Sequence, residues 1–151
     1  MMTGLLKVIH LLAAVLWIGG VFYAYAILRP SVGYLSGPDR RTLCARVFAR
    51  FFGCVWVLIA ALLISGYGML FTAFGGFASA GYLHAMQLFG WLTIIAFVVL
   101  AFGPYRRLHA AVAAEDWPRA GEMIPRIRRL VHIILWLGVV SIVVGGGGAY
   151  L

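Results

Sequence analysis

The chain has 151 residues, of which 64% are apolar and 11% are charged, and its mean hydropathy is +1.03. Soluble domains usually carry about 25% charged residues, and a domain of this size could not hide so much apolar surface. The composition therefore excludes an ordinary soluble enzyme, a disordered chain and a secreted disulfide scaffold, and it indicates an integral membrane protein.

Four stretches are apolar enough and long enough to cross a bilayer, which takes about 20 helical residues. No segment alternates with the two-residue period of a membrane strand. We therefore predict an all-α integral membrane four-helix bundle, with one transmembrane domain over 1–151. The expected helices cover about 5–28, 47–71, 82–102 and 130–149.

The first and last connections each have a recognisable sequence. Prolines and glycines between Pro30 and Pro38 break the chain after the first span. The stretch 104–125 is long enough for a separate short amphipathic helix, and Gly145 to Gly148 end or fray the last span. Small residues at four-residue spacing allow close helix approach, as in Ala61 with Ser65 and Ser141 with Gly145.

The basic residues set the expected orientation. They gather in the first and third connections, whereas the connection 72–81 carries no charge. Positive loops stay in the cytoplasm, so we predict both termini outside, N-out and C-out. In this arrangement the net charge of +8 comes from loops at the surface of the lipid bilayer. The charge therefore does not indicate a nucleic acid partner. The arginines concerned are Arg29, Arg40, Arg41, Arg46, Arg50, Arg106, Arg107, Arg119, Arg126, Arg128 and Arg129.

Ionisable residues inside a membrane are expensive, so each one is a functional hypothesis. His10 in the first span and His84 in the third lie near the outer ends of helices that run in the same direction. At about 1.5 Å per residue, we expect them within a few ångström of the same depth. Two such imidazoles can hold one metal axially, as a haem iron or a copper ion, and each can instead simply bond a neighbouring helix.

Helical spacing supplies the expected neighbours of the two histidines. Positions three, four and seven residues after each share its face. On the first span they include Ala14, where a small side chain leaves room for a macrocycle. Lys7 lies one turn outward and can pair with a haem propionate or with lipid headgroups. Aromatic residues at this spacing are also ordinary core packing. The expected cofactor-binding set is His10, His84, Lys7, Trp17, Ala14, Gln87 and Trp91.

Other groups give weaker predictions. Thioethers select Cu(I), so Met69 or Met86 could complete an outer copper site with the same histidines, although Met86 points about 200° away from His84 on a helix. His109 and His132 are candidates for a second, inner site. Cys44 and Cys54 lie in no metal-ligand spacing and are expected as free thiols.

The segment Leu6–Gly20 resembles the first helix of the copper resistance protein D (CopD) family of bacterial membrane proteins. The segments 46–52, 82–87 and 116–130 also look like those of short members, so the resemblance spans essentially the whole chain. It implies the bacterial inner membrane and an association with copper uptake from the periplasm.

A more distant similarity is to the HemJ-type protoporphyrinogen oxidases, which bind haem b. Lys7 and His10 match their K-x-x-H-like first helix, and Leu83 with His84 match part of their L-H-x-K element. Met86 stands where that family has Lys, and its Pro-Arg segment after the first helix is missing. The similarity implies haem binding more than oxidase activity.

Three functions follow as expectations. The first is a haem b protein with electron transfer, or a membrane oxidoreductase, with a quinone, a porphyrin or a redox protein as partner. The second is a CopD-like copper binding or uptake protein that uses His10 and His84 with Met69 or Met86. The third is a cofactor-free structural subunit, and a homodimer is compatible with all three.

Overall fold

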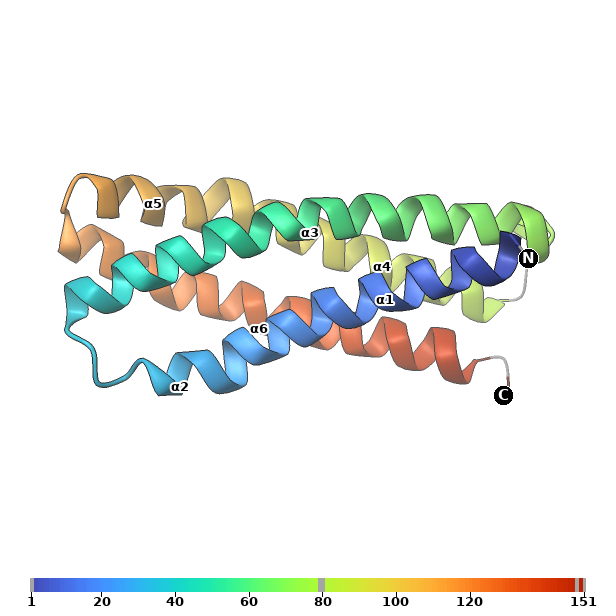
Figure 1. Cartoon of the computed structure of the whole chain (residues 1–151), viewed down its shortest axis with the longest axis horizontal. Helices are drawn as coiled ribbons and strands as arrows, with labels where there is room; N and C mark the ends of the chain where they lie inside the picture. Colours follow the sequence, from blue (N-terminus) through green and yellow to red (C-terminus); the bar gives the residue numbers. More distant parts are fainter. Residues whose placement is uncertain (1, 79–80, 149, 151) are drawn as a thin grey trace.

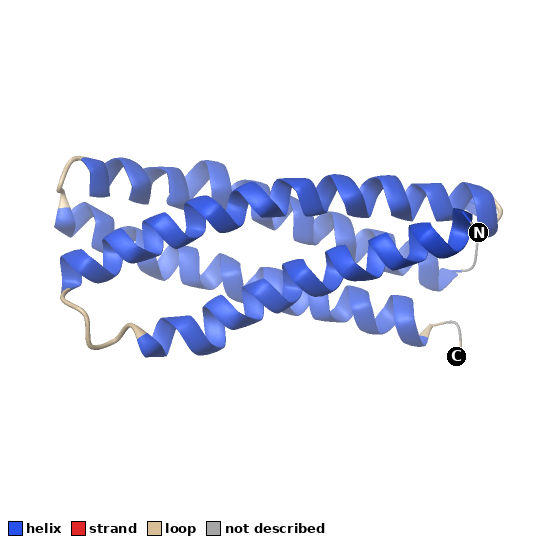
Figure 2. Ribbon diagram, in the orientation of Figure 1, coloured by secondary structure: helices blue, strands red, loops and turns tan. Residues whose placement is uncertain are grey.

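The computed structural model describes residues 2–78, 81–148 and 150, and within these ranges every regular element is helical. Four long helical segments run up, down, up and down beside one another (Figures 1 and 2). Each is long and apolar enough to cross a membrane: Met2–Ser31, Gly37–Ala73, Gly81–Ala113 and Trp117–Gly147. The predicted all-α four-helix membrane architecture is confirmed.

The first span is one helix with a widened turn. α1 (Met2–Phe22) continues through the π-helical η1 (Tyr23–Leu28) into α2 (Arg29–Ser31). Pro30 in α2 has no N–H to donate, and the preceding turn takes the wider hydrogen-bond pattern. The chain then turns at 32–36, as the prolines and glycines there predict.

The second span, α3 (Gly37–Ala73), begins at a capped end. The Ser36 hydroxyl accepts a hydrogen bond from the Asp39 backbone N–H at 3.2 Å, and Pro38 occupies the first turn. Both features favour a helix start, because they satisfy or remove backbone donors that have no helical partner. A short connection containing the 3-10 turn η2 (Gly76–Ala78) follows α3.

The third span has a widened turn like that of the first, and the fourth begins at a capped end like that of the second. α4 (Gly81–Leu100) passes through the π-helical η3 (Ala101–Tyr105) into α5 (Arg106–Ala113). α6 (Trp117–Gly147) begins at Asp116, whose carboxylate accepts a hydrogen bond from the Arg119 backbone N–H at 3.1 Å.

We call the end with the turns 32–36 and 114–116 the basic end, and the opposite end, with residues 74–78, the neutral end.

The expected helix boundaries were too short at the basic end. α3 begins at Gly37 instead of about 47, and α6 begins at Trp117 instead of about 130. The short amphipathic helix expected over 104–125 is present as α5 (Arg106–Ala113), although it continues from α4 through η3, and the rest of the stretch forms the turn at 114–116 and the start of α6. Charged residues end the bilayer-crossing stretch, whereas capping residues end the helix.

The helices approach most closely where a side chain is missing. α1 packs chiefly on α3, α4 packs on α6, and α1 also contacts α6. A Cβ at Gly145 would overlap Met86 of α4, and the Ser141 hydroxyl donates a hydrogen bond to the Met86 carbonyl at 3.2 Å. A Cβ at Gly66 would lie 3.0 Å from His10 Cε1. The predicted role of small residues at these helix contacts is confirmed.

The outward faces of the helices are also apolar. Leu5, Val57, Ile64 and Val143 are each more than 60% exposed, and many other large apolar side chains share this outer surface. Water would penalise such a surface, whereas lipid chains cover it without loss. The protein is therefore a multi-pass membrane protein in contact with the lipid bilayer.

We expect Gly138→Ala to destabilise the bundle, although alanine favours helices over glycine. A Cβ at Gly138 would overlap the Cδ1 atom of the buried Ile18 and lie 2.8 Å from its Cγ1. Overpacking of this kind costs about 1–3 kcal/mol. Thermal unfolding in detergent measures the effect, and Gly146→Ala, which meets open space, is the control. Equal shifts for both variants would contradict the close contact.

Candidate functional site

His10 lies at the contact between α1 and α3, near the neutral end. It is half-buried, and its Nδ1 atom is 3.1 Å from the hydroxyl oxygen of Ser65, which is fully buried. Gly66 beside Ser65 leaves space for the imidazole ring. The first intramembrane histidine is thus held in place by the neighbouring helix.

The hydrogen bonds of Ser65 favour one tautomer of His10. A serine hydroxyl has one proton, and the Ser65 oxygen lies 2.5 Å from the Ala61 carbonyl one turn earlier. Because that proton is given to Ala61, the Ser65 oxygen accepts a hydrogen bond from His10 Nδ1–H. The other ring nitrogen, Nε2, then carries the free lone pair. Metal-binding histidines in proteins commonly have this arrangement, with one nitrogen anchored and the other ligating.

The rest of the expected face of α1 turns inward. Trp17 is 3% exposed, Ala14 is half-buried, and Lys7 is exposed one turn outward from His10. The Trp17 ring packs edge-on against Phe97 of α4, with 5.9 Å between ring centroids. Trp17 and Ala14 therefore turn inward on α1, whereas Lys7 does not.

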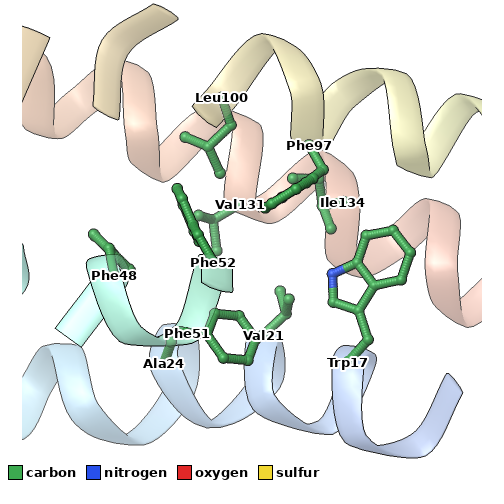
Figure 3. A pocket seen from close by; sticks show the side chains of 10 residues that line it. All are labelled: Trp17, Val21, Ala24, Phe48, Phe51, Phe52, Phe97, Leu100, Val131 and Ile134. Atoms are coloured by element: carbon green, nitrogen blue, oxygen red, sulfur yellow. The ribbon is translucent and has the colours of Figure 1, made fainter. Parts of the chain in front are cut away.

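Trp17 also borders a small cavity in the middle of the bundle (Figure 3). The cavity measures about 10 Å³, about the space of one water molecule. The indole nitrogen points toward this space in Figure 3, and it has no hydrogen-bond partner within the described residues. The cavity is otherwise lined by apolar side chains: Val21, Ala24, Phe48, Phe51, Phe52, Phe97, Leu100, Val131 and Ile134.

The corresponding face of α4 points outward instead. His84 is exposed, Trp91 is 42% exposed, and Gln87 is half-buried. The Trp91 indole donates a hydrogen bond to the Tyr67 hydroxyl of α3 at 3.1 Å. Met86, two residues after His84, packs on Gly145 of α6. His84 and Met86 therefore point to opposite sides of α4, as their spacing predicts.

Counted along the helices, the two histidines differ in depth. The packed rings of Trp17 and Phe97 mark a common level in the bundle. His10 lies seven residues outward from Trp17, whereas His84 lies thirteen residues outward from Phe97. With allowance for the reach of the rings, His84 is roughly one to two helical turns closer to the neutral end. This residue count favours an offset over the matched depth that was expected, and matched depth stays a prediction.

Of the two candidate thioethers, Met69 lies nearer His10 along the fold. It follows Ser65 by four residues on α3, so the two share one helix face. Met69 is half-buried, and Gly68 beside it packs on Leu6 of α1, one turn outward from His10. The α1–α3 contact thus carries an imidazole and a thioether on adjacent turns.

His109 and His132, the two candidates for an inner site, lie far apart. His109 of α5 is 6.2 Å from the Tyr105 ring, and His132 of α6 is 5.3 Å from the Tyr25 ring, between centroids. Measured from the turn at 114–116, His132 lies about eleven residues deeper, or about 16 Å along the helices. Cys44 and Cys54 are free thiols, as predicted.

Sequence reasoning missed two features. It treated Ser65 only as a small packing residue, although a hydroxyl inside a span is itself a signal for a hydrogen bond across helices. It also treated the arginines as separate interface anchors, whereas Arg29, Arg40, Arg41 and Arg128 line one cavity. Among the described residues, no three His, Cys, Asp or Glu side chains gather as a metal cluster.

Comparison with known proteins gives one match. The family model of copper resistance protein D, CopD, matches residues 45–147, which is more than half of the chain. No curated protein and no solved structure matches significantly. The matched range includes His84, Met69 and Met86 but not His10, so the α1 segment that resembles the family most strongly lies outside it. On this match, the chain belongs to the copper resistance protein D (CopD) family.

Proposed function

We propose that this protein binds copper ions and passes them on at the outer side of a bacterial inner membrane. Its family description is copper resistance, which supports copper as the cargo. The basic end would face the cytoplasm by the positive-inside rule, and the neutral end with His10 would face the periplasm. Copper would then reach the protein from the periplasm.

One observation carries the proposal. His10 is anchored through Nδ1 on Ser65, which leaves Nε2 as an unprotonated ligand atom at the α1–α3 contact. A histidine that only bonds the neighbouring helix would make the same contact with Ser65, and the metal assay below separates the two readings. Neutral imidazole is a good ligand for copper, and fixing its second nitrogen strengthens the bond to the metal.

Met69 is the second ligand in this proposal. A thioether is soft and favours Cu(I), and Met69 lies one turn from Ser65 on the same face of α3. A site with one imidazole and one thioether leaves room for an incoming ligand to take the ion, which suits transfer better than storage. His84 has no part in it, since its side chain is exposed on another helix.

The test is a metal and pigment assay on protein purified in detergent from cells supplied with a haem precursor. We expect the protein to retain about one Cu(I) per chain against a colorimetric Cu(I) chelator. We also expect no haem bands in the air-oxidised and dithionite-reduced spectra.

Two outcomes would overturn the proposal. A low-spin b-type spectrum, near one haem per chain and lost when His10 or His84 is replaced, would establish the haem function instead. A colourless protein that cedes all Cu(I) to the chelator would indicate a structural subunit.

A further inference from the structure

A second cavity lies at the basic end, away from His10. It measures about 740 Å³ and is a partly open groove bordered by the end of the first span, the first turns of α3 and the basic half of α6. Typical ligand sites measure about 300–1,000 Å³, so this space is the size of a small ligand. Figure 1 shows why it exists, since α1 and α3 diverge toward the turn that joins them.

The lining of this cavity is strongly positive. Four of its side chains are arginines, from three helical segments, and none is acidic. Two of the four acidic residues of the chain are engaged at helix starts: the Asp39 carboxylate accepts a hydrogen bond from the Ser36 hydroxyl, and the Asp116 carboxylate accepts one from the Arg119 backbone N–H. The cavity therefore favours an anion. Its arginines are Arg29, Arg40, Arg41 and Arg128.

The position of Arg41 depends on a glycine across the cavity. Its guanidinium lies over Gly121 of α6, where a Cβ would be 2.9 Å from the arginine Nη2. Gly37, one turn before Arg41, also leaves room for the side chain. These two glycines let a guanidinium lie between α3 and α6 at a point where a larger residue would displace it.

The inner part of the same cavity is apolar. On α3 the lining changes from arginine at 40 and 41 to Val47 and Phe48 within two turns. On α6 it changes from Arg128 to Val131, which is 8% exposed. A positive outer part with an apolar floor fits an anionic group that carries a hydrocarbon chain.

We propose that this cavity binds a phosphate group, and that in the membrane the group belongs to an anionic lipid. The planar guanidinium fork matches phosphate oxygens, and basic pockets between spans on the cytoplasmic side are suited to lipid headgroups. The apolar floor favours a lipid over free phosphate, which shares the same headgroup chemistry.

Native mass spectrometry of the detergent-purified protein tests this proposal, with phosphatidylglycerol and phosphatidylcholine as the added lipids. We expect the wild type to retain phosphatidylglycerol selectively. The double variant Arg41→Gln/Arg128→Gln should bind it about thirtyfold more weakly, from the usual contribution of each arginine near a charged headgroup.

A matched variant separates the cavity from overall charge. Arg106→Gln/Arg126→Gln removes the same charge from the same end, outside the cavity lining, and should bind within about twofold of wild type. Gly121→Val keeps every arginine but occupies the place of the Arg41 guanidinium, and it should also weaken binding. Thermal unfolding confirms that each variant is folded.

Three results would overturn the proposal. Equal losses in the two double variants would mean that only net charge matters. Equal retention of the two lipids would exclude recognition of an anionic headgroup. Stabilisation by inorganic phosphate, with no selective retention of phosphatidylglycerol, would make free phosphate the occupant and the lipid assignment wrong.

Discussion

We expect the His10→Ala variant to lose tight Cu(I) binding, with a Kd more than about 100-fold above wild type. Removing a partner that only orients a metal ligand costs about 10- to 100-fold, and removing the ligand itself costs more. His10 is the imidazole whose free nitrogen the structure assigns. Competition with a chelator of known Cu(I) affinity measures the change.

His84→Ala is the matched control, since His84 is exposed and lies outside the α1–α3 contact. Its Kd for Cu(I) should stay within about twofold of wild type. If the two histidine variants lose copper equally, the ligands come from both helices and the proposed site is wrong.

Ser65→Ala tests the anchoring of the ring separately from the ligand. The variant keeps His10 but removes the acceptor of its Nδ1–H, so copper affinity should fall about 10- to 100-fold. Thr93→Ala is its control, because Thr93 is also buried and bonded to a carbonyl one turn earlier, at Phe89. Unchanged affinity in Ser65→Ala would refute the assigned tautomer.

The second large effect is on stability. Phe97 is 1% exposed, and its ring lies between 5.1 and 5.9 Å, centroid to centroid, from the rings of Trp17, Phe52 and Trp56. Phe97→Ala leaves a cavity among these rings and should cost about 3 kcal/mol. The melting temperature in detergent should fall by about 6–12 °C.

Phe102→Ala provides the comparison one and a half turns away. Phe102 is 63% exposed on the outer surface, where lipid or detergent replaces the lost contacts. Its melting temperature should change by less than about 2 °C. A similar fall in both variants would show that ring size rather than burial sets the effect.

The sequence allowed the spans to be predicted, because about 20 apolar residues in a row have few alternatives. It did not allow the facing of α4 to be predicted. In a bilayer, lipid-facing and core-facing side chains are equally apolar, so the periodicity that orients a soluble helix is weak. Trp91 was therefore expected to line a site inside the bundle, although it is exposed. The close contacts at Gly138 and Gly145 show which helix faces pack inward, and these contacts are visible only in the folded structure.

For the candidate site, too, one part could be predicted from the sequence and another part could not. His10 could be singled out because a titratable group inside a span is costly. Its partner Ser65 could not be identified, since pairing residues 55 positions apart requires the crossing of two helices. The arginine cavity also depends on tertiary geometry, because its lining comes from three segments that are far apart in the sequence.

The aromatic layer at Trp17, Phe52 and Phe97 is an apolar barrier to ions between the two ends of the bundle. It lies about two turns deeper than His10, and among the described residues that line the 10 Å³ space the one side-chain nitrogen is an indole N–H, which cannot ligate a cation. A bare ion would lose its hydration there without replacement, at a cost of several kcal/mol. With the proposed copper site at His10, a single chain would receive copper on one leaflet without conducting it, and onward passage would require the rings to part or a neighbouring molecule to take the ion sideways.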